Sequence, residues 1–278
     1  MSTARSQVER ASRRVAPGLE ALARFGYASK GVVYGTIGVL ALSLALGGGG
    51  ATTDTKGALL RLQDLPAGSA LLWLLVVGLG GYALWQLLRA VLDPEHQGTE
   101  AKGLVKRAGY LISGVVYLTL AVFSARVAAP GSASRAQNSE AQTASQVLEL
   151  PGGQVLLGLA GVVLLAVAFR QFYNAYGARF MKHMAFTDVG AQYQGTLKRV
   201  GQVGVSARGL LLAIVGVFLL AAAWRNQASI VIGTSEALAW LREQPAGQFL
   251  LGAVALGTLC YGLWCVIQAL YRRIKVMD

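Results

Sequence analysis

The sequence predicts an all-α integral membrane protein with six transmembrane helices arranged as three parallel two-helix repeats. Hydrophobic residues make up 54% of the 278 residues, charged residues make up only 14%, and the mean hydropathy is +0.51. A soluble globular domain carries roughly 25% charged residues. Six apolar segments approach the ~20 residues that a membrane-spanning helix needs, and related motifs recur three times. This composition excludes a soluble enzyme, a disulfide-rich secreted module and a disordered chain.

The apolar segments are separated by loops of very unequal charge. The segments cover residues 27–46, 70–88, 109–125, 154–169, 209–224 and 246–270. Both termini and the second and fourth loops between these segments carry 19 Lys and Arg residues, whereas the first, third and fifth loops carry 6. Acidic residues divide 7 to 6 between the same two sides. Because basic loops stay on the cytoplasmic side of a membrane, we expect both termini to be cytoplasmic.

The first helix of each repeat opens with a common pattern of small residues. Its core is Gly-x4-Gly, and a further small residue follows the second glycine seven positions later. Seven residues are nearly two helical turns, so these small residues lie on one helix face. Close backbone approach at small residues supports helix association in lipid. We therefore expect six residues to pack between helices: Gly31, Gly38, Gly114, Ala121, Gly209 and Gly216.

The second helix of each repeat opens with Pro-(Ala/Gly)-Gly, at Pro66, Pro151 and Pro245. These copies are 85 and 94 residues apart, and the first-helix copies are 83 and 95 apart, so two landmarks indicate one repeat. Proline suits the first turn of a helix, where its missing N–H costs nothing, and we place it there. Amphipathic segments precede the prolines and predict brief helices at the outer interface over residues 58–65, 144–150 and 237–244.

The repeats divide the chain into residues 22–92, 105–176 and 198–273. A basic cytoplasmic tail over 1–21, interfacial or disordered, precedes them, and 177–197 form a cytoplasmic linker. Because each repeat crosses the membrane twice, all copies enter from the same side, unlike the inverted repeats of many transporters. Rotation about the membrane normal then relates the copies. This favours a pseudo-threefold bundle, although the sequence does not require one.

These motifs, Gly26-x4-Gly31-Val-Val-Tyr34 and Pro-(Ala/Gly)-Gly-x2-Leu-Leu, resemble those of a bacterial membrane family called domain of unknown function twelve-zero-six. The resemblance covers roughly residues 22–273, although the third copy has Leu212 in place of the tyrosine. It implies a three-hairpin architecture and a multi-pass protein of the bacterial inner membrane. It implies no activity and no catalytic residue.

Polar side chains recur near the predicted cytoplasmic end of each second helix. Counted from the prolines, positions +16, +19, +20 and +23 share one helix face. Side chains at such positions anchor helices at the interface or join neighbouring helices. The alternative is a polar vestibule or anion-binding pocket between the hairpins. Its candidate residues are Gln86, Arg89, Arg170, Gln171, Asn174 and Gln268.

The sequence contains no recognisable catalytic, metal or cofactor site. Cys260 and Cys265 lie about 140° apart around a helix, and the two histidines stand alone. No nucleophile with a neighbouring base appears, and no phosphate-binding loop. We therefore expect no enzyme activity and no cofactor. Basic residues are spread over four segments without a nucleic-acid-binding motif, so anionic lipid headgroups are their expected partners.

Two classes of function fit these features. The first is a non-enzymatic scaffold, accessory or lipid-binding protein, with the lipid bilayer and another membrane protein as candidate partners. The alternative is a small-solute or ion pathway through the polar vestibule. No acidic residue lies inside an apolar segment, so a carboxylate-driven pathway has no obvious carrier. A continuous polar cavity would favour the pathway, and a lipid-facing apolar groove would favour the lipid-binding protein.

Overall fold

The computed structural model describes residues 2–93, 98, 100–129, 140–185 and 192–272, and the described chain is almost entirely helical. Six long helices are each long and apolar enough to cross a membrane, which confirms the predicted spans. They are α1 (Ser2–Ala45), α3 (Gly68–Leu92), α4 (Ala101–Ala128), α6 (Gly153–Tyr176), α8 (Gln194–Arg225) and α10 (Gly247–Tyr271). Helix α1 continues through residues 2–21, so the tail is helical rather than disordered.

Short helices fill the connections, as predicted for the segments before each proline. These are α2 (Thr55–Gln63), α5 (Glu140–Leu148) and α9 (Thr234–Glu243), together with the 3-10 helices η1 (Arg179–His183) and η2 (Ala228–Ile230). Each of α2, α5 and α9 buries the residue seven positions before its proline, namely Leu59, Ala144 and Leu238. They therefore pack into the protein.

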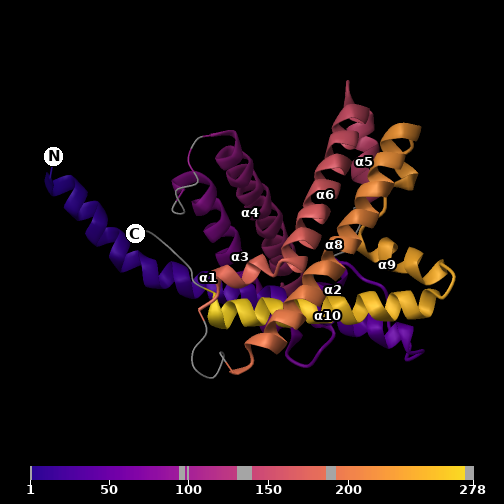
Figure 1. Cartoon of the computed structure of the whole chain (residues 1–278), viewed down its shortest axis with the longest axis horizontal. Helices are drawn as coiled ribbons and strands as arrows, with labels where there is room; N and C mark the ends of the chain where they lie inside the picture. The colour runs from indigo at the N-terminus through magenta and orange to yellow at the C-terminus, as the bar shows by residue number, and fades with distance from the viewer. Residues whose placement is uncertain (1, 94–97, 99, 130–139, 186–191, 273–278) are drawn as a thin grey trace.

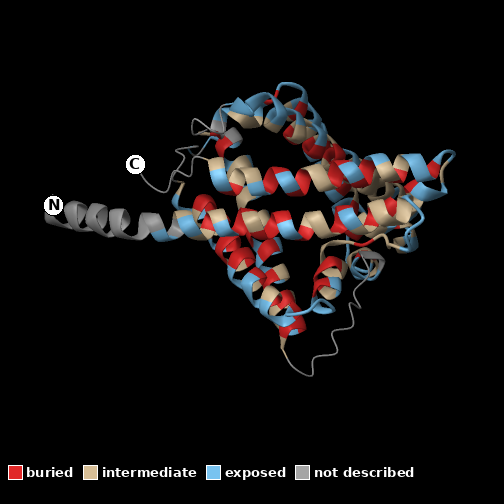
Figure 2. Ribbon diagram, turned by 90° about the horizontal axis from the view of Figure 1, so that it is seen from below, coloured by how far each residue is buried: buried red, intermediate tan, exposed pale blue. Residues whose placement is uncertain are grey.

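The closest helix pairs form between repeats rather than within them. Helix α3 packs most extensively on α4, α6 on α8, and α10 on α1, so each second helix lies against the first helix of the next repeat. In Figure 1, α1 and α10 run side by side along the lower part of the view, and the α3/α4 and α6/α8 pairs diverge above them toward the left and the right. Buried residues gather on the faces that the helices turn toward one another (Figure 2).

The three pairs use equivalent contacts at the ends of their helices. Arg24 donates to the carbonyl oxygens of Ala269 and Leu270, at 2.8 and 2.9 Å. Arg107 donates to Ala90 and Val91, and Gln202 donates to Ala175 and Tyr176. Each of the three donors lies two residues before the first glycine of the Gly-x4-Gly motif. Each satisfies carbonyl groups that a helix C-terminus leaves unpaired.

The small-residue face of each first helix lies in the same interface. All six small residues singled out from the sequence are buried. A Cβ atom at Gly38 would lie 2.6 Å from the backbone nitrogen of Leu259 in α10, and one at Gly114 would lie 2.7 Å from Leu87 in α3. Gly209 and Gly216 face α6 in the same way. These residues allow the backbones to approach at distances that larger side chains would prevent.

The second repeat lacks the internal contact that the other two possess. Helix α1 packs on α3 and α8 packs on α10, whereas α4 and α6 have almost no contact in the described chain. Gly26 and Gly204 are buried against Tyr82 and Tyr261, but a Cβ atom at the equivalent Gly109 would meet nothing within 4 Å. A ring of six helices is therefore open between α4 and α6, and the threefold axis stays a prediction.

The proline motif differs from its expected role in the first turn. The residue after each proline, Ala67, Gly152 or Ala246, is the N-cap of the second helix and adopts a left-handed conformation. The helix begins only at the following glycine. A Cβ atom at Gly247 would collide with the carbonyl oxygen of Arg242, and Gly68 and Gly153 face the same obstruction. The motif thus forms a sharp turn in which only glycine fits the third position.

Candidate functional site: a cationic cavity between the repeats

A cavity of about 190 Å³ lies where α1, α3, α6, α8 and α10 meet. Its walls come from all three repeats and combine basic, amide and aromatic side chains. The lining residues are Tyr27, Lys30, Tyr82, Gln171, Asn174, Phe180, Val205, Arg208, Tyr261, Trp264, Gln268 and Arg272.

Lys30 is the most deeply buried charged residue of this cavity, with 5% of its surface exposed. Its Nζ atom lies 4.5 Å from the ring centre of Tyr82, 4.9 Å from that of Tyr117 and 5.6 Å from that of Tyr27. The Tyr82 hydroxyl lies 3.4 Å away. The negative faces of aromatic rings attract a cation, so three tyrosines surround the ammonium group.

Arg208 and Arg272 bring two more cationic groups to the cavity. The Arg208 guanidinium donates to the hydroxyl of Tyr261 and lies 5.7 and 4.9 Å from the ring centres of Tyr34 and Tyr261. Arg272 lies 4.9 Å from the ring centre of Tyr27. Aromatic rings thus contact all three cations of the cavity.

The charges of these cations are not balanced by carboxylates. No Asp or Glu lines the cavity, and among the described residues none forms an ion pair with Lys30, Arg208 or Arg272. Removing a cation from water costs several kcal/mol even after relaxation, and one desolvated cation–π contact returns about 2 kcal/mol. The three cations also repel one another, so a bound anion would lower the free energy of this arrangement.

The cation–tyrosine pairs come from equivalent positions of the first and third repeats. Lys30 and Arg208 both lie four residues after the first motif glycine, and their partners Tyr82 and Tyr261 both lie sixteen residues after the proline. The second repeat has Ser113 and Val167 at these positions. Its helix α6 contributes the amides of Gln171 and Asn174 to the cavity instead.

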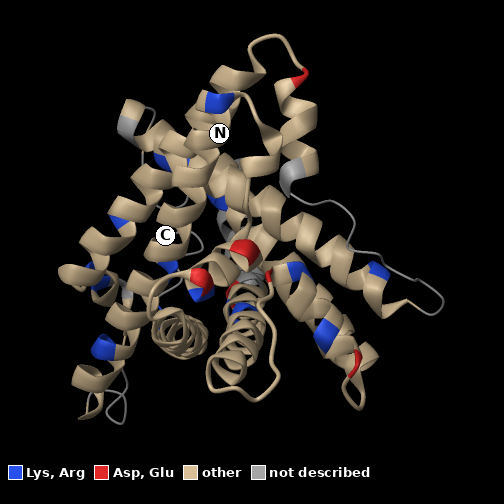
Figure 3. Cartoon of the chain, turned by 90° about the vertical axis from the view of Figure 1, so that its right-hand side faces the viewer, with Lys and Arg blue, Asp and Glu red and all other residues tan. Residues whose placement is uncertain are grey.

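A second cavity of about 230 Å³ adjoins the first and shares Asn174, Phe180, Gln268 and Arg272 with it. It extends to Arg170 and Arg179, which are exposed. The two cavities are therefore neighbours, and basic side chains line both of them. Figure 3 shows that Lys and Arg residues also occur on several other helices.

The structure separates the predicted vestibule residues into two groups. Gln171, Asn174 and Gln268 line the cationic cavity, and Arg170 lines its neighbour. Gln86 and Arg89 line neither. Arg89 donates to Gln86 at 2.8 Å and lies 3.8 Å from the ring centre of Tyr110 in α4. The prediction that all six share one vestibule is thus wrong for this pair, because close packing of α3 on α4 buries it there.

The motifs of the sequence do not mark Lys30, Arg208 or Arg272 as site residues. Lys30 and Arg208 contribute instead to the excess of Lys and Arg residues that predicts the topology. Their signal was present, because both charges occupy the same motif position inside an otherwise apolar helix. Arg272 gave no such signal, because it follows the last apolar segment as an ordinary flanking cation.

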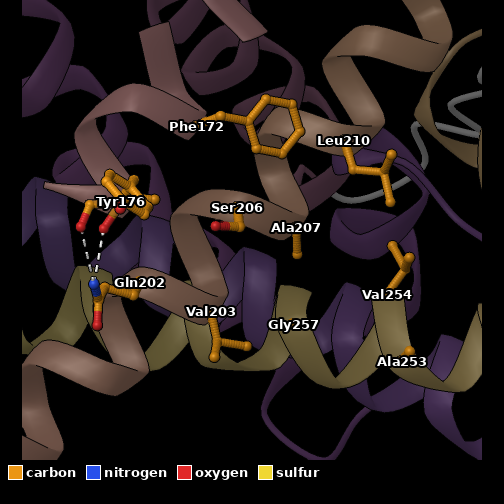
Figure 4. Close-up of a pocket in the computed structure, with 11 residues that line it drawn as sticks. Phe172, Tyr176, Gln202, Val203, Ser206, Ala207, Leu210, Ala253, Val254 and Gly257 are labelled. Atoms are coloured by element: carbon orange, nitrogen blue, oxygen red, sulfur yellow. Dashed lines mark hydrogen bonds between the residues drawn. The ribbon is translucent and has the colours of Figure 1, made fainter. Parts of the chain in front are cut away.

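A separate apolar groove of about 680 Å³ lies along α8, between α6 and α10 (Figure 4). Phe172, Ala175 and Tyr176 of α6 form one wall, and Ala253, Val254 and Gly257 of α10 form the other. Its floor is formed by residues of α8: Gln202, Val203, Ser206, Ala207 and Leu210. Since Val205 and Arg208 project from the opposite face of α8, the groove and the cationic cavity are distinct.

Within the described ranges, no group of three or more His, Cys, Asp or Glu residues could hold a metal ion. Cys260 and Cys265 are free thiols, and Cys265 is buried.

Comparisons with known proteins agree with the repeat architecture. A family model described as Domain of Unknown Function (DUF1206) matches three times, over residues 25–93, 108–178 and 203–272. Uncharacterized protein YxxB of Bacillus subtilis (strain 168) is 34% identical over 257 residues, which cover 92% of each chain. No solved structure matches the chain.

Proposed function

Because the chain belongs to the family described as Domain of Unknown Function (DUF1206), whose description assigns no activity, we propose a function from its geometry: a non-enzymatic, lipid-binding integral membrane protein. The apolar groove between α6, α8 and α10 carries this proposal. It exposes mainly carbon atoms and is large enough for part of an acyl chain. Pockets that enclose small ligands commonly measure 300–1,000 Å³.

The groove has a defined shape because polar contacts hold its walls together. Gln202 donates to the carbonyl oxygens of Ala175 and Tyr176 at 3.0 and 3.4 Å, which joins α8 to the end of α6 (Figure 4). On the other side, a Cβ atom at Gly257 would contact Ala207, so this glycine brings α10 close to α8. A fixed apolar concavity in lipid selects acyl chains by shape rather than by hydrophobicity, since the surrounding lipid is equally apolar.

The alternative is a small-solute or ion pathway. The presence of a cationic cavity supports this alternative, but the cavity does not extend through the whole helix bundle. Lys30 and Arg208 lie in the first half of their spans, and the α10 residues of the cavity lie in the second half of that helix. Its lining thus comes from one half of the bundle. A cavity confined to one half favours binding over conduction. Passage of an anion through liposomes that contain the purified protein would support the pathway instead.

The cellular setting follows from charge. We place the protein in the bacterial inner membrane with both termini cytoplasmic, because Lys and Arg concentrate on that side. Anionic headgroups of the cytoplasmic leaflet would then be its nearest charged neighbours. A further membrane protein as partner is compatible with this role.

Filling the groove tests the proposal. Ser206→Trp would place an indole against the α6 wall, and we expect it to reduce lipid retained by the detergent-purified protein at least by half, as measured by native mass spectrometry. Val217→Trp is the matched control, because Val217 is an exposed residue of the same helix and does not line the groove. Equal lipid retention by both variants and the unmodified protein would refute specific binding of lipid in the groove.

A further inference from the structure

We propose that the cationic cavity binds a phosphate-type oxyanion, supplied either as free phosphate or as the phosphate of a lipid headgroup. This inference does not depend on lipid in the apolar groove, which lies on the opposite face of α8.

The first argument is that three cationic hydrogen-bond donors converge on the cavity and that no carboxylate lines it. Lys30, Arg208 and Arg272 bring an ammonium and two guanidinium groups into one cavity. Lys30 is 5% exposed, so water cannot screen its charge effectively. No carboxylate lines the space, and the contacting rings compensate for only part of the lost hydration. The missing negative charge would come from a ligand.

The second argument comes from neutral side chains. Gln171, Asn174 and Gln268 line the cavity, and no hydrogen bond engages their side-chain amides elsewhere in the described chain. Each amide can donate two hydrogen bonds. Together with the guanidinium forks, they would surround a ligand that has several acceptor oxygens.

The size and the donor type of the cavity point to one class of anion. A guanidinium presents paired N–H groups that match two oxygens of a phosphate or carboxylate. Donors from α1, α6, α8 and α10 approach from several directions, which suits tetrahedral oxygens better than a planar carboxylate. About 190 Å³ is smaller than the ~300–1,000 Å³ of pockets for drug-sized ligands. The cavity therefore fits a phosphate group rather than a whole nucleotide.

Access is provided by the adjoining cavity, which shares four lining residues and reaches the exposed Arg170 and Arg179. These arginines lie at the end of α6 and in η1, where a headgroup or a soluble anion could both arrive. The geometry thus defines the chemistry of the ligand, and the experiment distinguishes its source.

The test uses the full-length protein in neutral detergent with inorganic phosphate as the probe. We expect phosphate to raise the melting temperature above that in sodium chloride of equal ionic strength. Arg208→Gln should weaken the apparent phosphate affinity at least tenfold, since it removes charge-assisted hydrogen bonds. Arg225→Gln is the matched control, because Arg225 is an exposed residue at the C-terminal end of α8, far from the cavity lining. If Arg208→Gln does not fold, Asn174→Ala tests the same cavity and should weaken binding severalfold.

A second arm identifies the source of the phosphate. The same variants are reconstituted in nanodiscs that contain phosphatidylglycerol and phosphatidylcholine, and the lipids retained after extraction are identified by native mass spectrometry. Retention of phosphatidylglycerol that Arg208→Gln or Asn174→Ala abolishes, without a response to inorganic phosphate, assigns a headgroup. A response to inorganic phosphate alone assigns a free anion. If neither probe binds, or if the cavity variants bind both as well as Arg225→Gln does, the proposal is wrong.

Discussion

At the scale of single residues, the repeat motifs correspond to specific backbone requirements. The position two residues before the first motif glycine supplies Arg24, Arg107 or Gln202 to carbonyl groups at the end of a neighbouring helix. The Pro-(Ala/Gly)-Gly motif supplies a left-handed residue and then a glycine with no room for a Cβ atom. The identities of these residues therefore follow from geometry at helix ends, where backbone groups lack partners within their own helix.

The left-handed alanines offer a residue-scale prediction. Ala246 has φ of 59°, and its counterpart in the second repeat is Gly152. A left-handed conformation costs a non-glycine residue roughly 1–2 kcal/mol, so Ala246→Gly should raise the free energy of unfolding by about 1 kcal/mol. Thermal unfolding in detergent measures this.

Ala160→Gly is the control for this change, because Ala160 is exposed in the interior of α6. There, glycine should lower stability by about 1 kcal/mol. Destabilisation by both substitutions would show that Ala246 is not strained.

At the scale of helices, side-chain differences explain why the second repeat stays open. Gly78 of α3 and Gly257 of α10 admit the neighbouring first helix, whereas α6 has Val163 at this position. Val163 is 54% exposed. On the opposing face of α4, Val116 is 47% exposed, although its counterpart Val33 in α1 is 1% exposed. A bulky α6 face without the cation–tyrosine pair thus leaves α4 with nothing to pack on.

Substitutions at two glycines of α4 compare its packed interface with α3 and its open side toward α6. Gly114→Leu should lower the free energy of unfolding by about 1–3 kcal/mol, because a Cβ atom there lies 2.7 Å from Leu87. Gly109→Leu should be neutral or stabilising by up to about 1 kcal/mol, because the space around Gly109 is open. Melting temperatures of the two variants provide the comparison. An equal loss in both would mean that α4 and α6 are packed together in the membrane.

At the scale of the whole molecule, the pairs α10/α1, α3/α4 and α6/α8 link the repeats in sequence order and join the last repeat to the first. The helices α1 and α10 lie side by side although they are the first and last spans (Figure 1). An even number of spans places the two ends of the chain on one side of the membrane, and the cationic cavity lies toward that side.

Topology provides the whole-molecule prediction. In a variant with Cys260→Ser and Cys265→Ala, a cysteine introduced at Gln227 should react with a membrane-impermeant maleimide added to intact cells. A cysteine introduced at Thr196 should react only after the cells are opened. Both positions are exposed and lie near opposite ends of α8. The reverse pattern would overturn the assignment of the basic face to the cytoplasm.

The sequence by itself determined the six spans, the short outer helices, the three repeats and the small-residue faces. These features depend on local hydropathy and on the 3.6-residue period, which a sequence displays directly. It also indicated that Gln171, Asn174 and Gln268 belong to a polar stripe, because they share one helix face.

Only the tertiary structure decided which helices meet. Arg24 donates to Ala269 across 245 residues of chain, and the cavity joins Lys30, Arg208 and Arg272 from distant segments. Gln86 and Arg89 belong to the same stripe yet pack against α4 instead. In lipid, apolar side chains gain little by exchanging lipid for another helix, so hydropathy does not select the partner. The partner helix is selected by close approach at glycines and by polar contacts at helix ends. Both kinds of contact depend on two surfaces that are far apart in sequence.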